Sequence, residues 1–261
     1  MAAIRWYNRA GAGDAAPLVL LHGFTGSPLS WAAVAQALPS ERSVAALSLP
    51  GHHPAVPVAR GFDANLDQVA DNIARAGLTG CQLVGYSLGA RTALGLAVRH
   101  PVLVATLTLI GVHPGLADEG ARRARVAHDA AWIEKLQRAG LEAFIDAWER
   151  QPIFARQAHL PAPLRARQRA IRAGHDARAL ARSLAEMGLG AMPNYWPQLT
   201  ALTMPVSWIT GAEDAKFTAL AEAGVAAMRA AGLHPNGLQV PRCGHNPLLE
   251  APAALASLLG S

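Results

Sequence analysis

The 261-residue chain contains only two cysteines, Cys81 and Cys243. Two cysteines cannot build a disulfide scaffold or a zinc cluster, so we expect two reduced thiols and no metal site. No apolar run approaches the ~18 residues that a membrane span requires. The first residues also lack the apolar stretch of a secretory signal, so the sequence predicts a cytoplasmic protein without a membrane span.

Lysine is nearly absent, because 21 of the 23 basic residues are arginine. No basic run is interleaved with aromatic residues, so nucleic-acid binding is not predicted. Residues 113–199 carry 13 basic and 9 acidic side chains, against 10 and 9 in the rest of the chain. The positive excess therefore lies in the middle third, although a general bias toward Arg and Ala explains part of it equally well.

Apolar residues make up 51% of the chain, which excludes a disordered protein. Six strand-length apolar runs end at turn residues, and each is typical of a strand that is buried on both faces. These runs are Ala16–Leu21, Val44–Leu49, Cys81–Val84, Val104–Ile110, Val206–Thr210 and Leu238–Val240. A first hairpin that includes Ile4–Asn8 is also predicted.

Helical patterns alternate with these runs, which predicts parallel crossover units and an α/β fold with a mostly parallel, doubly wound sheet. The helical segments are Trp31–Leu38, Phe62–Ala76, Leu88–Arg99, Ala219–Ala231 and Pro247–Leu259. Residues 113–198 interrupt the alternation with helical patterns alone. We expect a core of residues 1–112 and 199–261, with residues 113–198 inserted as a helical cap.

The sequence Gly85-Tyr86-Ser87-Leu88-Gly89 matches the nucleophile-elbow pattern G-x-S-x-G. It follows a predicted strand and opens a predicted helix, which is the context that this motif needs. Small residues at both flanks allow a turn tight enough to lift Ser87 out of the strand. The sequence therefore predicts a nucleophilic or basic serine at position 87.

A serine of this kind needs a base and an acid that orients the base. His245 lies between the last predicted strand and the last helix, and Asp214 follows the strand Val206–Thr210. We prefer Asp214 to the neighbouring Glu213. The order Ser87, Asp214, His245 is that of α/β-hydrolases.

Two backbone amides are candidates for an oxyanion hole, which holds a developing negative charge. Leu88 N–H lies at the start of the helix after Ser87. The turn His22-Gly23-Phe24 follows the first long apolar run, so its Phe24 N–H is the second candidate. His22 itself is expected to brace the turn.

Together these motifs resemble the α/β-hydrolase superfamily over almost the whole chain. Further stretches resemble the 2-succinyl-6-hydroxy-2,4-cyclohexadiene-1-carboxylate synthases of menaquinone biosynthesis. They are His22–Gly26, Gly85–Arg91, Gly111–Leu116, Trp148–Phe154, Asp214–Phe217 and Gly244–Asn246. This resemblance implies an α/β-hydrolase fold with a cap, and substrate-binding roles for Tyr86, Arg91, Arg125, Trp148 and Arg172.

The implied activity is a lyase step that eliminates pyruvate from 2-succinyl-5-enolpyruvyl-6-hydroxy-3-cyclohexene-1-carboxylate, with the triad as general base and no cofactor. Arginine suits such a polycarboxylate, because its planar fork pairs with a carboxylate through two parallel bonds. Two alternatives remain: a carboxylic-ester hydrolase that forms an acyl-enzyme, and a non-catalytic binding protein. We expect the three arginines to converge on one pocket above Ser87 if the lyase interpretation holds.

Overall fold

The computed structural model describes residues 4–9, 16–39 and 41–260. Its centre is a seven-stranded sheet in the order β1-β3-β2-β4-β5-β6-β7. The strands are β1 (Ile4–Asn8), β2 (Leu18–Leu21), β3 (Val44–Leu47), β4 (Cys81–Tyr86), β5 (Val104–Ile110), β6 (Val206–Gly211) and β7 (Asn236–Val240). Only β1 is antiparallel to its neighbour. The predicted mostly parallel, doubly wound sheet is therefore confirmed.

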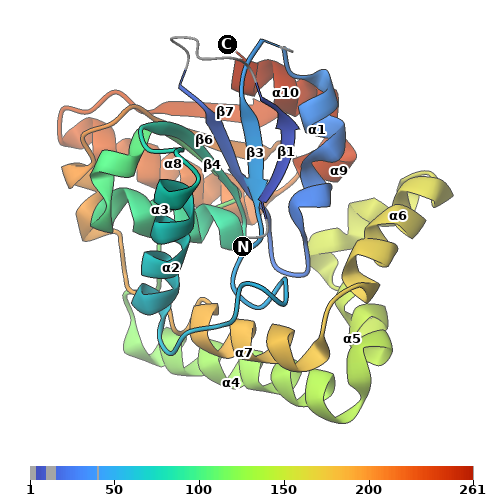
Figure 1. The fold of residues 1–261 in the computed structure, drawn as a ribbon. Helices are drawn as coiled ribbons and strands as arrows, with labels where there is room; N and C mark the ends of the chain where they lie inside the picture. The colour runs from blue at the N-terminus through green and yellow to red at the C-terminus, as the bar shows by residue number, and fades with distance from the viewer. Residues whose placement is uncertain (1–3, 10–15, 40, 261) are drawn as a thin grey trace.

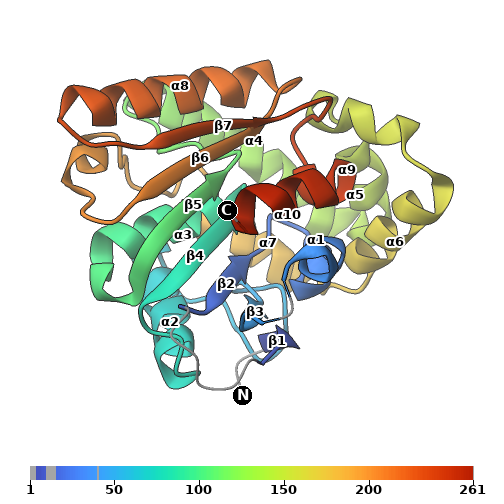
Figure 2. The ribbon, with the colours of Figure 1, turned by 90° about the horizontal axis from the view of Figure 1, so that it is seen from above.

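Helices cover both faces of this sheet (Figure 2), and each face has its own apolar cluster. One face is covered by α2 (Phe62–Arg75), α3 (Leu88–Arg99) and α8 (Ala215–Ala230). The other is covered by α1 (Ala32–Ala37), α9 (Pro247–Glu250) and α10 (Pro252–Gly260). The short helices η1 (Pro28–Trp31), η2 (Pro101–Leu103) and η4 (Pro197–Ala201) are 3-10 turns that join these elements.

Between β5 and η4 lie four α-helices and one 3-10 helix, which extend below the sheet and to its right in Figure 1. They are α4 (Glu119–Arg138), α5 (Gly140–Glu149), η3 (Pro152–His159), α6 (Ala162–Ala173) and α7 (Ala177–Met187). These helices have an apolar cluster of their own around Leu136, Phe144 and Leu180. We propose 113–198 as the extent of this cap.

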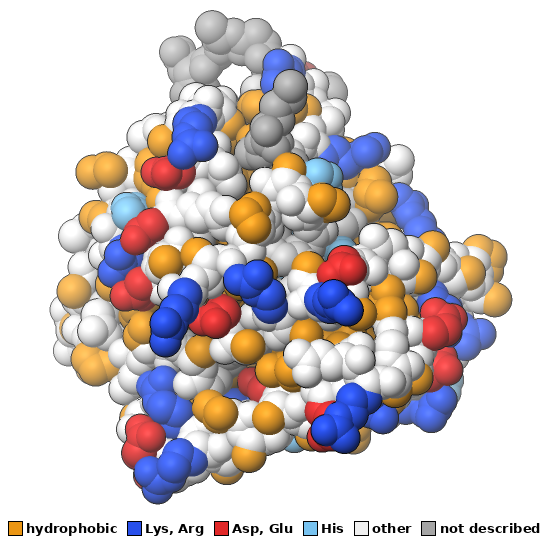
Figure 3. All heavy atoms as spheres, turned by 60° about the horizontal axis from the view of Figure 1, so that its bottom comes forward, with side chains coloured by type: hydrophobic (Ala, Val, Ile, Leu, Met, Phe, Trp, Pro, Cys, Tyr) orange, Lys and Arg blue, Asp and Glu red, His pale blue; other side chains and the backbone are white. Residues whose placement is uncertain are grey.

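Charged side chains of both signs are distributed over the face that carries the cap (Figure 3). Arginines on α4 pair with acidic residues one turn away, as in Arg138–Glu134. Part of the basic charge of the middle third is therefore balanced by ion pairs within the cap.

Two predicted elements are wrong. Ile4–Asn8 does not form a hairpin with the strand that follows it, because β1 pairs with β3 and leaves β2 between β3 and β4. The single C-terminal helix is broken at Ala251, where φ is −150°. Pro252 follows directly, and its ring and missing N–H prevent a helix from continuing through it.

Both cysteines are free and buried, Cys81 at the start of β4 and Cys243 in the loop after β7. Across the described ranges, no helix is long and apolar enough to cross a membrane.

Candidate active site

Ser87 lies in a sharp turn between β4 and α3, with φ 53° and ψ −109°. A positive φ at a non-glycine residue costs of order 1–3 kcal/mol and persists only where the surroundings enforce it. A Cβ on Gly85 would overlap the Gly89 carbonyl, and a Cβ on Gly89 would overlap the carbonyl of Leu21. The Ser87 N–H donates to Ile110 O on the neighbouring strand at 2.8 Å. The turn is therefore enforced by close backbone packing, which only glycine permits at its flanks.

His245 and Asp214 are brought to this turn by the loops after β7 and β6. His245 Nδ1 donates to Asp214 Oδ2 at 2.6 Å, and His245 Nε2 lies 3.4 Å from Ser87 Oγ. The second oxygen of Asp214 accepts from Phe217 N–H at 3.3 Å, so the same carboxylate caps α8. The chain thus places an acid, an imidazole and a hydroxyl in line, which is the arrangement for proton transfer at the hydroxyl.

Phe24 and Leu88, whose backbone amides are the candidate oxyanion donors, both line the cavity above Ser87. Within the described residues, neither amide donates a hydrogen bond to another protein group. Leu88 is the first residue of α3, where helix N–H groups have no intrahelical acceptor. Both donors are therefore free to hold an anionic oxygen.

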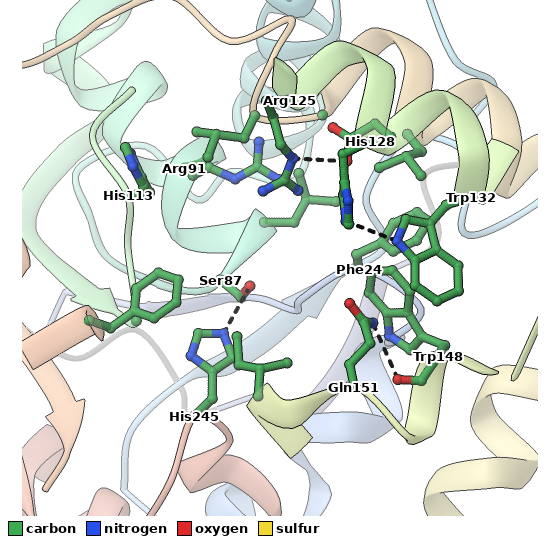
Figure 4. A pocket seen from close by; sticks show the side chains of 18 of the residues that line it. Phe24, Ser87, Arg91, His113, Arg125, His128, Trp132, Trp148, Gln151 and His245 are labelled. Carbon is green, nitrogen blue, oxygen red and sulfur yellow. Dashed lines mark hydrogen bonds and ion pairs between the residues drawn. The ribbon is translucent and has the colours of Figure 1, made fainter. Parts of the chain in front are cut away.

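The cavity above Ser87 has a volume of about 450 Å³ and lies between the sheet and the cap (Figure 4). One wall is aromatic: Phe24 meets Trp148 edge to face at 5.3 Å, and Trp148 meets Trp132 at 5.0 Å. The end that holds Arg91 and Arg125 is cationic (Figure 4), and Lys216 also lines the cavity. The cavity thus offers an apolar surface for a ring and cations for its acidic substituents.

The two arginines of the cavity are fixed by different partners. Arg91 Nη1 donates to the Met187 carbonyl at 2.8 Å, and Arg125 Nε pairs with Asp129 Oδ1 at 2.8 Å. Burial, and next the neighbouring Arg125, lower the pKa of Arg91 to about 9. Burial also raises the pKa of Asp129. Two cations held side by side in this way favour an anionic ligand.

His113 lies at the same cationic end of the cavity (Figure 4). Its Nδ1 accepts from Gly115 N–H at 3.1 Å. Burial lowers its pKa to about 4, with further lowering by Lys216, Arg91 and Arg125. His113 is therefore neutral at neutral pH, and its Nε2–H is a hydrogen-bond donor.

The expectation that Arg91, Arg125 and Arg172 share one pocket is wrong for Arg172. Its side chain lines a small neighbouring cavity of about 60 Å³, which also touches Tyr86 and Ser87. Arg172 Nη1 pairs with Glu149 Oε1 at 2.7 Å, and Arg172 is only 3% exposed. The Glu149 carboxylate of the cap therefore already pairs with the Arg172 guanidinium. Trp148 and Phe154 line both cavities and lie between this guanidinium and the larger cavity.

Several side chains of the cavity wall were not among the site residues predicted from the sequence. His128 and Trp132 lie one turn apart on α4, and Trp132 Nε1 donates to His128 Nε2 at 3.1 Å. Their i, i+4 spacing was the available signal, because such residues share one helix face. Gln151 lies in the stretch Trp148–Phe154 that resembles the synthases, but no role was assigned to it; it follows the end of α5 and lines the cavity.

In the ranges that the structure covers, no three His, Cys, Asp or Glu side chains are grouped as metal ligands.

Comparison with known proteins shows the family of this chain. The model of the alpha/beta hydrolase family matches residues 18–258. The chain is 36% identical to the 2-succinyl-6-hydroxy-2,4-cyclohexadiene-1-carboxylate synthase of Enterobacter sp. (strain 638), over 97% of this chain and 93% of that protein. The synthase of the same name from Serratia proteamaculans is also 36% identical, over 95% and 93%.

Solved structures give the same result. MenH from S. aureus matches with a TM-score of 0.91 and 25% identity, covering 99% of this chain and 97% of that one. A thermophilic esterase from Thermogutta terrifontis shares the fold with a TM-score of 0.81 at 22% identity, over 98% and 90%. The chain belongs to the α/β hydrolase family and, within it, to the 2-succinyl-6-hydroxy-2,4-cyclohexadiene-1-carboxylate synthases.

Proposed function

We propose that this protein is a carbon–oxygen lyase that forms 2-succinyl-6-hydroxy-2,4-cyclohexadiene-1-carboxylate and pyruvate from the 5-enolpyruvyl precursor in menaquinone biosynthesis. The observation that carries the proposal is the cavity in which Ser87 faces Arg91, Arg125 and Lys216. The precursor has three carboxylates: one on the ring, one on the succinyl chain and one on the enolpyruvyl group. Three cations around one serine suit that charge.

The chemistry follows from the positions of the double bonds. The precursor has its ring double bond at C3, and the product has double bonds at C2 and C4. A proton therefore leaves C2, the C2–H electrons form the C2–C3 double bond, and the old double bond moves to C4–C5. The C5–O bond breaks, and the enol of pyruvate leaves with the electron pair and takes up a proton.

In this proposal Ser87 Oγ removes the C2 proton while His245 Nε2 takes the serine proton. Asp214 holds the imidazole at 2.6 Å and stabilises its positive charge. C2 is next to the succinyl ketone, so negative charge develops on the ketone oxygen. The Phe24 and Leu88 amides are the proposed donors to that oxygen.

Binding roles are assigned by position in the cavity. Arg91 and Arg125 are proposed to hold two of the carboxylates, and Lys216 the third. Trp148 supplies an apolar face for the ring. Tyr86 lies beside His245, with ring centroids 5.5 Å apart, and is proposed to bound the site on that side. No cofactor takes part.

The compartment proposed for this reaction is the cytoplasm. Two unpaired thiols in a chain of this length agree with a reducing environment.

The test is release of pyruvate from the precursor, measured beside hydrolysis of a panel of short neutral esters. We expect pyruvate formation above the uncatalysed rate and little ester hydrolysis. Ester turnover without pyruvate release would contradict the lyase proposal and support a carboxylic-ester hydrolase, which uses the same triad through an acyl-enzyme. If a serine-directed phosphonate labels Ser87 but neither substrate is turned over, the remaining interpretation is a non-catalytic binding protein.

A further inference from the structure

Thr25, the residue after the proposed oxyanion donor Phe24, has φ 61°. A β-branched residue rarely adopts a positive φ, because its side chain crowds the backbone there. Thr25 is 1% exposed, so solvent contacts do not stabilise this conformation. The contacts that Thr25 makes with its neighbours must therefore hold it.

Every polar group of Thr25 has a partner on another element. Its N–H donates to His52 Nε2 at 3.2 Å, and its carbonyl accepts from His175 Nε2 at 3.2 Å. Its hydroxyl oxygen accepts from Arg172 Nε at 3.4 Å. His52 belongs to the core, whereas Arg172 lies in α6 and His175 in the loop before α7.

The core side of this arrangement is rigid. His52 Nδ1 donates to Pro50 O at 3.1 Å, which leaves Nε2 as the acceptor that Thr25 needs. His22 also connects the loop after β2, which contains Thr25, with the loop after β3, which contains His52. Its Nε2 accepts from Leu49 N–H at 3.1 Å, and its Nδ1 donates to Gly23 O at 2.8 Å. Burial lowers the pKa of His22 to about 3 and that of His52 well below 6.5, so both are neutral acceptors.

The cap side is also held in place. Arg172 is fixed by Glu149 on α5 at 2.7 Å and lies over the Phe154 ring at 5.5 Å. The His175 ring meets the His52 ring edge to face at 5.3 Å. Two cap residues therefore reach the core at Thr25, the residue directly after Phe24, whose amide is the proposed oxyanion donor.

We propose that His175 and Arg172 are positioning residues that act through Thr25 to hold the Phe24 amide in place for the developing anion. The inference rests on the proposed function only in taking Phe24 N–H as an oxyanion donor. It gives Arg172 a role different from carboxylate binding. It also makes the oxyanion hole complete only while the cap is packed on the core.

The test compares His175→Ala with His175→Gln, which keeps an N–H donor of similar reach. His159→Ala is the matched control, because His159 is an exposed histidine of the cap in η3. We expect His175→Ala to lower kcat about tenfold with KM nearly unchanged, since a donor displaced by a fraction of an ångström loses part of its effect. His175→Gln should recover most of that loss, and His159→Ala should behave as wild type.

A second readout does not need the natural substrate. The rate at which a serine-directed phosphonate labels Ser87 depends on the same donors, because the phosphoryl oxygen enters the oxyanion hole. We expect the labelling rate of His175→Ala to fall by a similar factor. If this happens in a protein that releases no pyruvate, the lyase proposal fails and the positioning role stands.

The positioning role is overturned if His175→Ala matches His159→Ala in both kcat and labelling rate, even if its melting temperature is lower. Should His175→Ala not fold, Thr25→Val is the second variant. It keeps the shape and backbone groups of Thr25 and removes the oxygen that accepts from Arg172. A labelling rate equal to that of wild type in Thr25→Val would then refute the positioning role of Arg172.

Discussion

The sheet side and the cap side of the cavity are built in different ways. Ser87, Asp214 and His245 follow three strands of one sheet, and the tight backbone packing around Gly85 and Gly89 fixes the serine turn. On the cap side, side chains hold side chains, as in Arg125–Asp129 and Arg172–Glu149. Positions set by backbone geometry follow from local motifs, whereas positions set by ion pairs depend on which partner is within reach.

The largest effect is expected on the sheet side. Ser87→Ala removes the group proposed to move the proton, so turnover of the enolpyruvyl substrate should fall ~10³-fold or more. The buried contacts around residue 87 remain, and the melting temperature should change little. Steady-state kinetics with a thermal melt measure both quantities. Turnover near that of wild type would remove Ser87 from the mechanism.

On the cap side, Arg125→Ala should act selectively. Arg125 is proposed to bind a carboxylate away from the reacting bond, and a charge-assisted contact of this kind is worth roughly 1.5–3 kcal/mol. We expect kcat/KM for the acidic substrate to fall by about one to two decades, and any activity on a neutral ester to be nearly unaffected.

Arg123→Ala is the matched control for this prediction. Arg123 also lies on α4 but is exposed and paired only with Glu119, at 3.8 Å. If Arg125→Ala lowers both activities equally, Arg125 only supports the packing of the cap through Asp129.

The sequence predicted the two sides unequally well. The elbow motif at Ser87 and the places of Asp214 and His245 directly after predicted strands can be read locally in the sequence, and the structure brings the three residues together as expected. Arg172 was expected in the main cavity because the family resemblance implies a substrate-binding role for it. Its side chain instead pairs with Glu149, which is 23 positions away in the chain. Lys216 lies in the stretch Asp214–Phe217 that resembles the synthases, but its side chain is exposed, and the sequence assigned it no role in the cavity.

Buried histidines should make stability depend on pH. His22 has an ordinary pKa of 6.5 when unfolded and about 3 when folded. The stability that neutral His22 contributes to the folded protein is present above pH 6.5. It is lost progressively as the pH falls toward 3, because the unfolded chain binds the proton more tightly. Between pH 7 and pH 5 this amounts to about 2 kcal/mol of unfolding free energy.

Urea denaturation at the two pH values tests this prediction. His22→Gln keeps a polar side chain that does not titrate, so its stability should change by about 2 kcal/mol less between pH 7 and pH 5. An identical pH dependence in the two proteins would mean that His22 is protonated to the same extent folded and unfolded.

The smallest expected effect separates two of the aspartates that cap helices, Asp118 and Asp214. Asp118 caps α4 by accepting from Ala121 N–H at 2.7 Å, and Asp214 caps α8 in the same manner. Only Asp214 has its second oxygen on His245. Asp118→Ala should therefore cost about 1 kcal/mol of unfolding free energy and leave kcat/KM unchanged, while Asp118→Asn keeps the acceptor and most of the stability. A loss of turnover in Asp118→Ala would mean that the start of α4 controls how the cap sits over Ser87.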